Sequence, residues 1–158
     1  CATVQCDFAL PERFDLTYIS SDGKKERPVM LHRVILGSME RFMGALIEHY
    51  AGAFPVWLAP VQAMVIPITD RSHDYADSVF RRLQDEDIRV EVDKRNEKLQ
   101  YKIREGELNK IPYMLIIGDK EKEAGTVSLR ARKDGDIGAI KIEGFLEKIK
   151  KEITNKVN

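Results

Sequence analysis

Residues Arg27–Arg41 read RPVMLHRVILGSMER, and FMGALIEHYAGAFPVWLAP follows at once. The mostly apolar run Val29–Leu36 predicts a strand with one buried histidine, His32. Gly37-Ser38 then predicts a turn into an amphipathic helix over residues 38–50. The predicted apolar face of that helix consists of Phe42, Met43, Leu46, Ile47 and Tyr50.

Arg41 falls in the first turn of this predicted helix. A cation there opposes the helix dipole, at a cost of roughly 0.3 kcal/mol or more. We therefore expect Arg41 to serve a ligand. A planar, always-charged guanidinium at a strand-to-helix turn suits a nucleotide phosphate or base.

Two further strands are predicted upstream, at Thr3–Phe8 and Phe14–Ser20, with Pro11 between them and a turn at residues 21–24. Their short connections predict antiparallel neighbours of Val29–Leu36. Downstream, the two prolines of AFPVWLAP predict a stiff connection, and we place a domain boundary near Ala59-Pro60.

The rest of the chain alternates between strand and helix patterns. The alternation predicts an α/β/α layered domain with a mixed sheet and helices on both faces. With the upstream part, the predicted fold class is α/β: a partial antiparallel sheet plus one helix, then this three-layer domain. The expected elements are strands at 62–68, 88–92, 113–117 and 126–132, helices at 69–85, 99–107 and 142–156, and a turn at 118–120.

The composition is that of an ordinary globular protein of 158 residues, with 43% hydrophobic and 33% charged residues. No apolar run reaches the roughly 20 residues of a membrane span, and no signal peptide is visible. Cys1 and Cys6 are expected to be reduced thiols, without a disulfide and without a CxxC zinc motif. The abrupt start at Cys1 suggests a truncated chain.

The formal net charge is zero, so total charge gives no support for nucleic-acid binding. Residues 94–110 nevertheless hold six cations against three anions. This local excess is either a modest RNA footprint or a solvated helix face.

The run HRVILGSMERF resembles motif 3 of the class II aminoacyl-tRNA synthetases, and among them the threonyl-tRNA synthetase family. The resemblance covers nearly the whole chain. It implies that residues 1–60 are the last part of the catalytic domain and residues 61–158 the anticodon-binding domain. Motifs 1 and 2, the dimer interface and the editing domain would lie upstream, so the resemblance implies that residues 1–158 alone are inactive.

The resemblance also implies roles for residues in the first segment. Arg41 would be the motif 3 arginine that contacts ATP, and Thr3, Gln5 and Ser38 would line the ATP and threonine pocket. His32 would be one ligand of the catalytic Zn²⁺, which selects threonine through its hydroxyl. Its partner ligands, a cysteine and a second histidine, would lie upstream, so we expect weak zinc binding or none here.

In the second segment, RNEK, KIRE, PYMLIIGDKE and VSLRAR carry the resemblance. Unpaired anticodon bases are read on their Watson–Crick edges. By position, the resemblance makes Asn96, Arg104, Glu121 and Arg130 the anticodon readers, with Lys110 replacing a family arginine and contacting phosphate. From the residues alone, Arg104 and Glu121 could instead be a surface ion pair. Phe80, Tyr101 and Tyr113 are predicted to be core or near-core.

The resemblance implies part of a threonine–tRNA ligase that uses ATP and Mg²⁺, binds tRNA(Thr), and acts as a cytoplasmic homodimer without membrane or DNA. Two alternatives remain open. One is a non-catalytic tRNA-binding module, and the other is a synthetase paralogue acting as an accessory subunit. The substrate-pocket residues Thr3, Gln5, His32, Ser38 and Arg41 argue against the paralogue.

Overall fold

A computed structural model describes residues 2–157. The chain forms two compact units, residues 1–48 and 49–158. The predicted reduced state of Cys1 lies outside the described residues. Cys6 is an exposed free cysteine.

Unit 1 contains two short antiparallel ladders. β1 (Thr3–Asp7) pairs with β4 (Met30–Val34), which places Gln5 opposite His32. β2 (Tyr18–Ile19) pairs with β3 (Lys25–Glu26) across the predicted turn. α2 (Met39–Tyr50) follows β4, within a residue of the predicted helix.

The predicted strand Phe14–Ser20 is wrong over most of its length, and a short helix was missed before it. α1 (Ala9–Arg13) begins where Asp7 Oδ1 accepts hydrogen bonds from two backbone N–H groups of its first turn. Pro11 is tolerated in that turn because its missing N–H has no helical partner to lose. Asp15, with φ of 46°, then turns the chain and leaves only β2 extended.

Unit 1 exposes much of its apolar surface, as the unpaired strands predict. Pro11 is the only buried residue among residues 2–48. The exposed large apolar side chains include Val4, Phe8, Ile19, Leu31 and Ile35.

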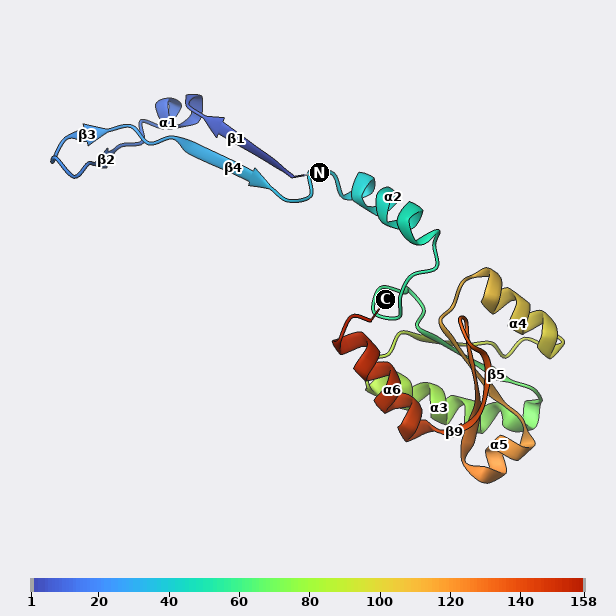
Figure 1. Ribbon diagram of the computed structural model, residues 1–158. Helices are drawn as coiled ribbons and strands as arrows, with labels where there is room; N and C mark the ends of the chain where they lie inside the picture. Colours follow the sequence, from blue (N-terminus) through green and yellow to red (C-terminus); the bar gives the residue numbers. More distant parts are fainter. Residues whose placement is uncertain (1, 158) are drawn as a thin grey trace. The chain divides into compact units, whose positions relative to one another are not determined.

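Unit 2 is built on a five-stranded mixed sheet in the order β6-β5-β7-β8-β9. Figure 1 labels β5 and β9 of this sheet and the four helices α3, α4, α5 and α6. β5 is parallel to both β6 and β7, and β8 is antiparallel to β7 and β9. The strand bounds are Ala63–Pro67 for β5, Val90–Val92 for β6, Tyr113–Ile117 for β7, Thr126–Ala131 for β8 and Gly135–Lys141 for β9.

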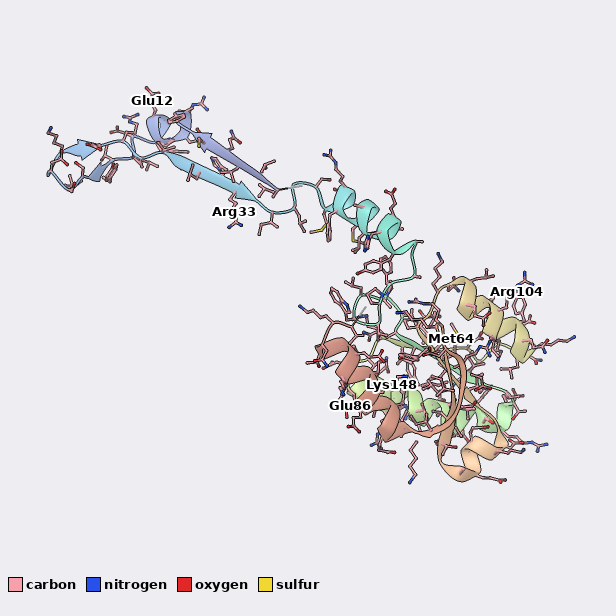
Figure 2. The ribbon with its side chains drawn as sticks, viewed as in Figure 1. Glu12, Arg33, Met64, Glu86, Arg104 and Lys148 are labelled. Carbon is pink, nitrogen blue, oxygen red and sulfur yellow. The ribbon has the colours of Figure 1, made fainter. Side chains whose placement is uncertain are left out.

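Helices cover both faces of this sheet, which confirms the predicted three-layer fold. α3 (His73–Asp85), entered through η1 (Asp70–Ser72), and α6 (Ile142–Thr154) pack on one face around the main core. α4 (Leu99–Leu108) packs on the other face, over Met64 of β5 and Met114 of β7. Met64 is labelled in Figure 2. Within residues 2–157, no helix combines the length and apolar character that crossing a membrane requires.

Two elements of unit 2 were missed. The predicted turn at 118–120 is instead the start of α5 (Asp119–Ala124), because Glu121 Oε2 accepts the Gly118 N–H at 2.9 Å. Gly125 directly follows α5 as its C-cap, and its φ of 65° suits glycine. β9 is interrupted by a register shift against Leu129-Arg130, so its sequence lacks clean alternation.

Candidate functional site

The first candidate site is at the start of α2. Ser38 caps the helix: its Oγ accepts the Arg41 backbone N–H at 3.3 Å and donates to Glu40 Oε2 at 3.1 Å. A backbone N–H bond and the Ser38 hydroxyl keep the pKa of Glu40 below its usual value. The cap fixes the backbone of the first turn, and the Arg41 side chain remains exposed to solvent.

A hollow of about 330 Å³ opens beside this turn. Thr3, Ser38 and Arg41 line it, together with Ala2 and Gly37. Three of the four residues predicted to bind ATP and threonine therefore meet at one place, although they come from β1 and from the turn before α2. The fourth, Gln5, lies two residues along β1 and shares a face with Thr3.

His32 lies across the ladder from Gln5, and its Nε2 is 3.1 Å from Asp7 Oδ2. The Leu10 backbone N–H is the main cause that lowers the pKa of Asp7, and His32 adds to it. The predicted burial of His32 is wrong, because its side chain is 39% exposed on a two-stranded ladder.

The side chains around His32 determine whether it has the partners that a zinc site needs. Within residues 2–157, no group of three or more His, Cys, Asp or Glu side chains is placed to hold a metal ion. Catalytic zinc takes three protein ligands. His32 fits the role of one such ligand, with Asp7 as its hydrogen-bond partner, and the other ligands would have to come from outside residues 2–157.

The second candidate site is in unit 2, around α4. Asn96 is exposed in the loop between β6 and α4, and Arg104 is exposed on α4 (Figure 2). Arg130 lies on β8, where its guanidinium donates to Glu107 Oε1 of α4 at 3.1 and 3.3 Å. Lys110 follows α4, and its ammonium donates to the Ala51 carbonyl.

Arg104 and Glu121 form no ion pair, so that alternative is wrong among the described residues. Glu121 instead caps α5 through the Gly118 N–H. The four predicted anticodon readers and Lys110 therefore come from the β6–α4 loop, α4, the turn after α4, α5 and β8. No ion pair joins any two of their side chains within residues 2–157. For Arg130 to bind a base edge, its contact with Glu107 would have to break.

Sequence reasoning missed a polar cluster beneath the loop that carries Asn96. Asp93 is buried and accepts Arg95 Nε at 2.9 Å and Arg95 Nη2 at 2.6 Å. Arg95 also pairs with Glu105, which accepts the Tyr101 hydroxyl at 3.0 Å. The hydrogen bonds from Arg95 keep the pKa values of Asp93 and Glu105 below their usual range.

This cluster changes how the local excess of cations is interpreted. Arg95 is neutralised by two carboxylates, and Lys94 pairs with Asp77 at 2.7 Å. Lys102 is buried and donates to the carbonyls of Asp93 and Pro67. Of the six cations counted in residues 94–110, Arg104 and Lys98 are exposed and have no hydrogen bond or ion pair from their side chains in residues 2–157.

The predicted aromatic positions are confirmed in two of three cases. Tyr113 is buried in the main core, and Phe80 packs against it. Tyr101 is 47% exposed, so its predicted place near the core is wrong. Its hydroxyl bond to Glu105 turns it toward the surface cluster. An aromatic face is therefore accessible next to the predicted RNA-binding residues.

Two family models match the chain and define its class. The tRNA synthetase class II core domain (G, H, P, S and T) matches residues 1–50. The anticodon binding domain matches residues 62–152. The chain belongs to the anticodon-binding domain family, and a segment of a class II synthetase core precedes that domain. The predicted family and fold class are confirmed.

The chain is similar to two curated threonine–tRNA ligases. It is 64% identical to that of Caldanaerobacter subterraneus subsp. tengcongensis over 156 residues, which is 99% of this chain and 24% of the relative. It is 63% identical to that of Clostridium botulinum strain Hall over 158 residues, which is all of this chain and 25% of the relative. The chain thus spans about a quarter of the length of these relatives.

Solved structures give the same result at the level of fold. The RNA-binding domain of threonyl-tRNA synthetase from Cryptosporidium parvum Iowa II superimposes with a TM-score of 0.83 at 37% identity, covering 96% of this chain and 38% of that one. Prolyl-tRNA synthetase from Cryptosporidium parvum, at 20% identity, superimposes with a TM-score of 0.70 and covers 98% of this chain and 35% of that one. This second likeness shows the shared fold alone.

Proposed function

We propose that this chain is the C-terminal part of a threonyl-tRNA synthetase, which activates threonine with ATP and Mg²⁺ and joins it to tRNA(Thr). The observation that carries the proposal is the 63–64% identity to threonine–tRNA ligases along the whole chain, across both units. The proposed domains are residues 1–60, from the catalytic core, and residues 61–158, which read the anticodon. We further propose a cytoplasmic homodimer.

In the proposed active site, Arg41 contacts the ATP phosphates or base. A guanidinium held at a fixed turn is suited to stabilise charge that develops on the triphosphate as the acyl-adenylate forms. Thr3 and Ser38, which line the same hollow, would orient the substrates, with Gln5 beside them. His32 is proposed as one ligand of a Zn²⁺ that binds the amino group and hydroxyl of threonine when present.

In the proposed anticodon site, the readers differ in the chemistry that they offer. Asn96 presents both a donor and an acceptor, whereas Arg104 and Arg130 present forks of donors. Glu121 can accept from an exocyclic amine, and Lys110 offers a point charge to phosphate. The exposure of Asn96, Arg104 and Lys110 supports the assignment.

A second function has a specific observation in its favour for the 158-residue chain. Unit 1 exposes most of its apolar side chains, whereas unit 2 has a continuous buried core. We therefore expect this chain to bind tRNA without forming threonyl-adenylate, as a recognition module.

Binding to a threonine-tRNA anticodon stem–loop RNA tests the proposal. The control RNA has its second and third anticodon bases exchanged, and both are measured at two salt concentrations. We expect tight binding that the exchange abolishes. Equal binding to both RNAs that fades with salt would reduce the interaction to phosphate attraction and contradict the proposal.

A further inference from the structure

The segment that joins α2 to β5, residues 51–60 and here called the connector, is held down by side chains of unit 2. It has no helical or strand ladder of its own, so its carbonyls need other partners. Arg89 donates to the carbonyls of Ala59 and Trp57, both at 2.9 Å. Gln62 donates to the Val56 carbonyl at 2.9 Å.

Arg132, directly after β8, is the main side-chain donor to the first half of the connector. Its Nη2 donates to the carbonyls of Ala53 at 3.1 Å and Phe54 at 2.8 Å. Its Nη1 donates to the Lys110 carbonyl at 2.5 Å. Arg132 forms no ion pair within residues 2–157, so its guanidinium serves backbone carbonyls alone. The fork shape allows it to join two segments that are far apart in sequence.

Lys110 is tied to the connector twice. Its backbone, at φ of 57°, is in the left-handed region and is held by Arg132. Its ammonium donates to the Ala51 carbonyl. A Cβ on Gly52 would lie 3.5 Å from Lys110 Nζ, so the two segments approach closely. The position of the Lys110 side chain therefore depends on the connector and on Arg132.

We propose that Arg132 is a positioning residue for RNA recognition: it fixes the Lys110 turn to the connector and so sets where the Lys110 ammonium meets the RNA. The inference rests on the proposed function, because it assumes that Lys110 contacts tRNA. The C-terminus of α4 holds the turn locally, because the Lys110 N–H donates to the Glu107 carbonyl and the Ile111 N–H to the Gly106 carbonyl, each at 3.0 Å. Arg132 adds the bonds that join this turn to the connector. Without Arg132, the ammonium would sample more positions and bind phosphate less well.

A double-mutant cycle in the 158-residue chain tests this inference, with the threonine anticodon stem–loop RNA as the probe. Lys110→Met should weaken binding about tenfold and reduce the salt dependence by about one phosphate contact. Arg132→Met should weaken binding about fivefold. Because Arg132 acts through Lys110, the double variant should bind no more weakly than Lys110→Met, instead of the roughly fiftyfold that independent effects would give.

Two further variants separate positioning from charge and from stability. Arg132→Lys keeps the charge but cannot bridge three carbonyls, so it should lose about threefold in affinity and show the same non-additivity. Arg89→Met removes two connector bonds that do not involve Lys110. It should lower the melting temperature yet leave RNA affinity within about twofold. Thermal unfolding of every variant identifies any that has lost its fold. If Arg132→Met has lost its fold, Arg132→Lys replaces it in the double-mutant cycle.

The outcomes distinguish the inference from the function beneath it. Failure of the unmodified chain to discriminate the two stem–loops overturns the proposed function, and the inference falls with it. If the unmodified chain discriminates the two stem–loops but the losses of RNA affinity in the cycle are additive, the inference alone is overturned. Full affinity in Arg132→Lys does the same, because charge would then be sufficient. Loss of affinity in Arg89→Met would reduce the effect to general stability and also contradict the inference.

Discussion

At the scale of single residues, Asp93 organises the loop between β6 and α4. Its carboxylate is buried, accepts three hydrogen bonds from the backbone and side chain of Arg95, and lies near the buried ammonium of Lys102. A buried carboxylate stays ionised only when its partners offset the loss of hydration. Since Asn96 follows Arg95 directly, the cluster also fixes the start of the proposed anticodon-reading loop.

This leads to a prediction for Asp93→Asn. At pH 7 the variant should lose about 1–3 kcal/mol of unfolding free energy, because Arg95 and Lys102 lose their anionic partner. The folded-state pKa of Asp93 lies below the ordinary 3.8, so its contribution is present above that value and is lost as pH falls below it. Urea unfolding measured from pH 7 to pH 3 should show the unfolding free energies of the unmodified chain and of Asp93→Asn converging as the pH falls.

The matched control is Asp77→Asn, which breaks the more exposed pair with Lys94. Exposed pairs contribute little, so the loss should stay below about 1 kcal/mol. Equal losses of unfolding free energy in Asp93→Asn and Asp77→Asn would contradict the buried role of Asp93. So would a difference in unfolding free energy between Asp93→Asn and the unmodified chain that does not change with pH.

At the scale of elements, predictions succeeded where periodicity was strong. Val29–Leu36 contains β4, and Tyr113–Ile117 is β7 residue for residue, because each is a short apolar run between clear breaks. β9 was missed because a register shift and Gly138, at φ of 95°, disturb its alternation. α5 was missed because six residues between two glycines follow the pattern of a turn, and only the capping contact of Glu121 distinguishes the helix.

The contact between α4 and the sheet gives a prediction at this scale. Gly106→Ala would normally stabilise a helix by up to about 1 kcal/mol. Here a Cβ would lie 2.6 Å from the Met114 sulfur, in a buried position. We expect a net loss of about 1–2 kcal/mol from overpacking. Gly144→Ala on α6 is the control, since its Cβ would meet the flexible Ile140 side chain at 3.4 Å.

Thermal or denaturant unfolding of both glycine variants measures the difference. Gly144→Ala should leave stability unchanged or raise it slightly, while Gly106→Ala lowers it. Stabilisation in both would mean that Met114 moves aside without cost, and that α4 is packed less tightly against β5 and β7 than the structure indicates.

At the scale of the whole molecule, the resemblance predicted residues but not their surroundings. Thr3, Ser38 and Arg41 were predicted to share a pocket, and they line one hollow. The contact of Arg130 with Glu107 and the role of Arg132 in holding the connector could not be predicted, since partners more than 20 residues apart leave no local pattern. The pairing of Lys94 with Asp77 and of Arg95 with Glu105 was also missed, because these partners are 17 and 10 residues apart and lie on different elements.

The last prediction separates the two proposed sites within a full-length synthetase that contains this chain. Arg41→Ala removes a charge that the adenylation transition state needs, so it should lower ATP-dependent threonine activation about 100-fold or more while tRNA affinity stays within about twofold. Asn96→Ala should leave activation unchanged and weaken tRNA(Thr) binding by about 1–3 kcal/mol, through loss of one base-edge contact. Pyrophosphate exchange measures activation, and filter binding measures tRNA affinity. The two sites lie on separate units, so their effects should be independent. If each substitution damaged both activities equally, the assignment of activation to one unit and RNA reading to the other would be wrong.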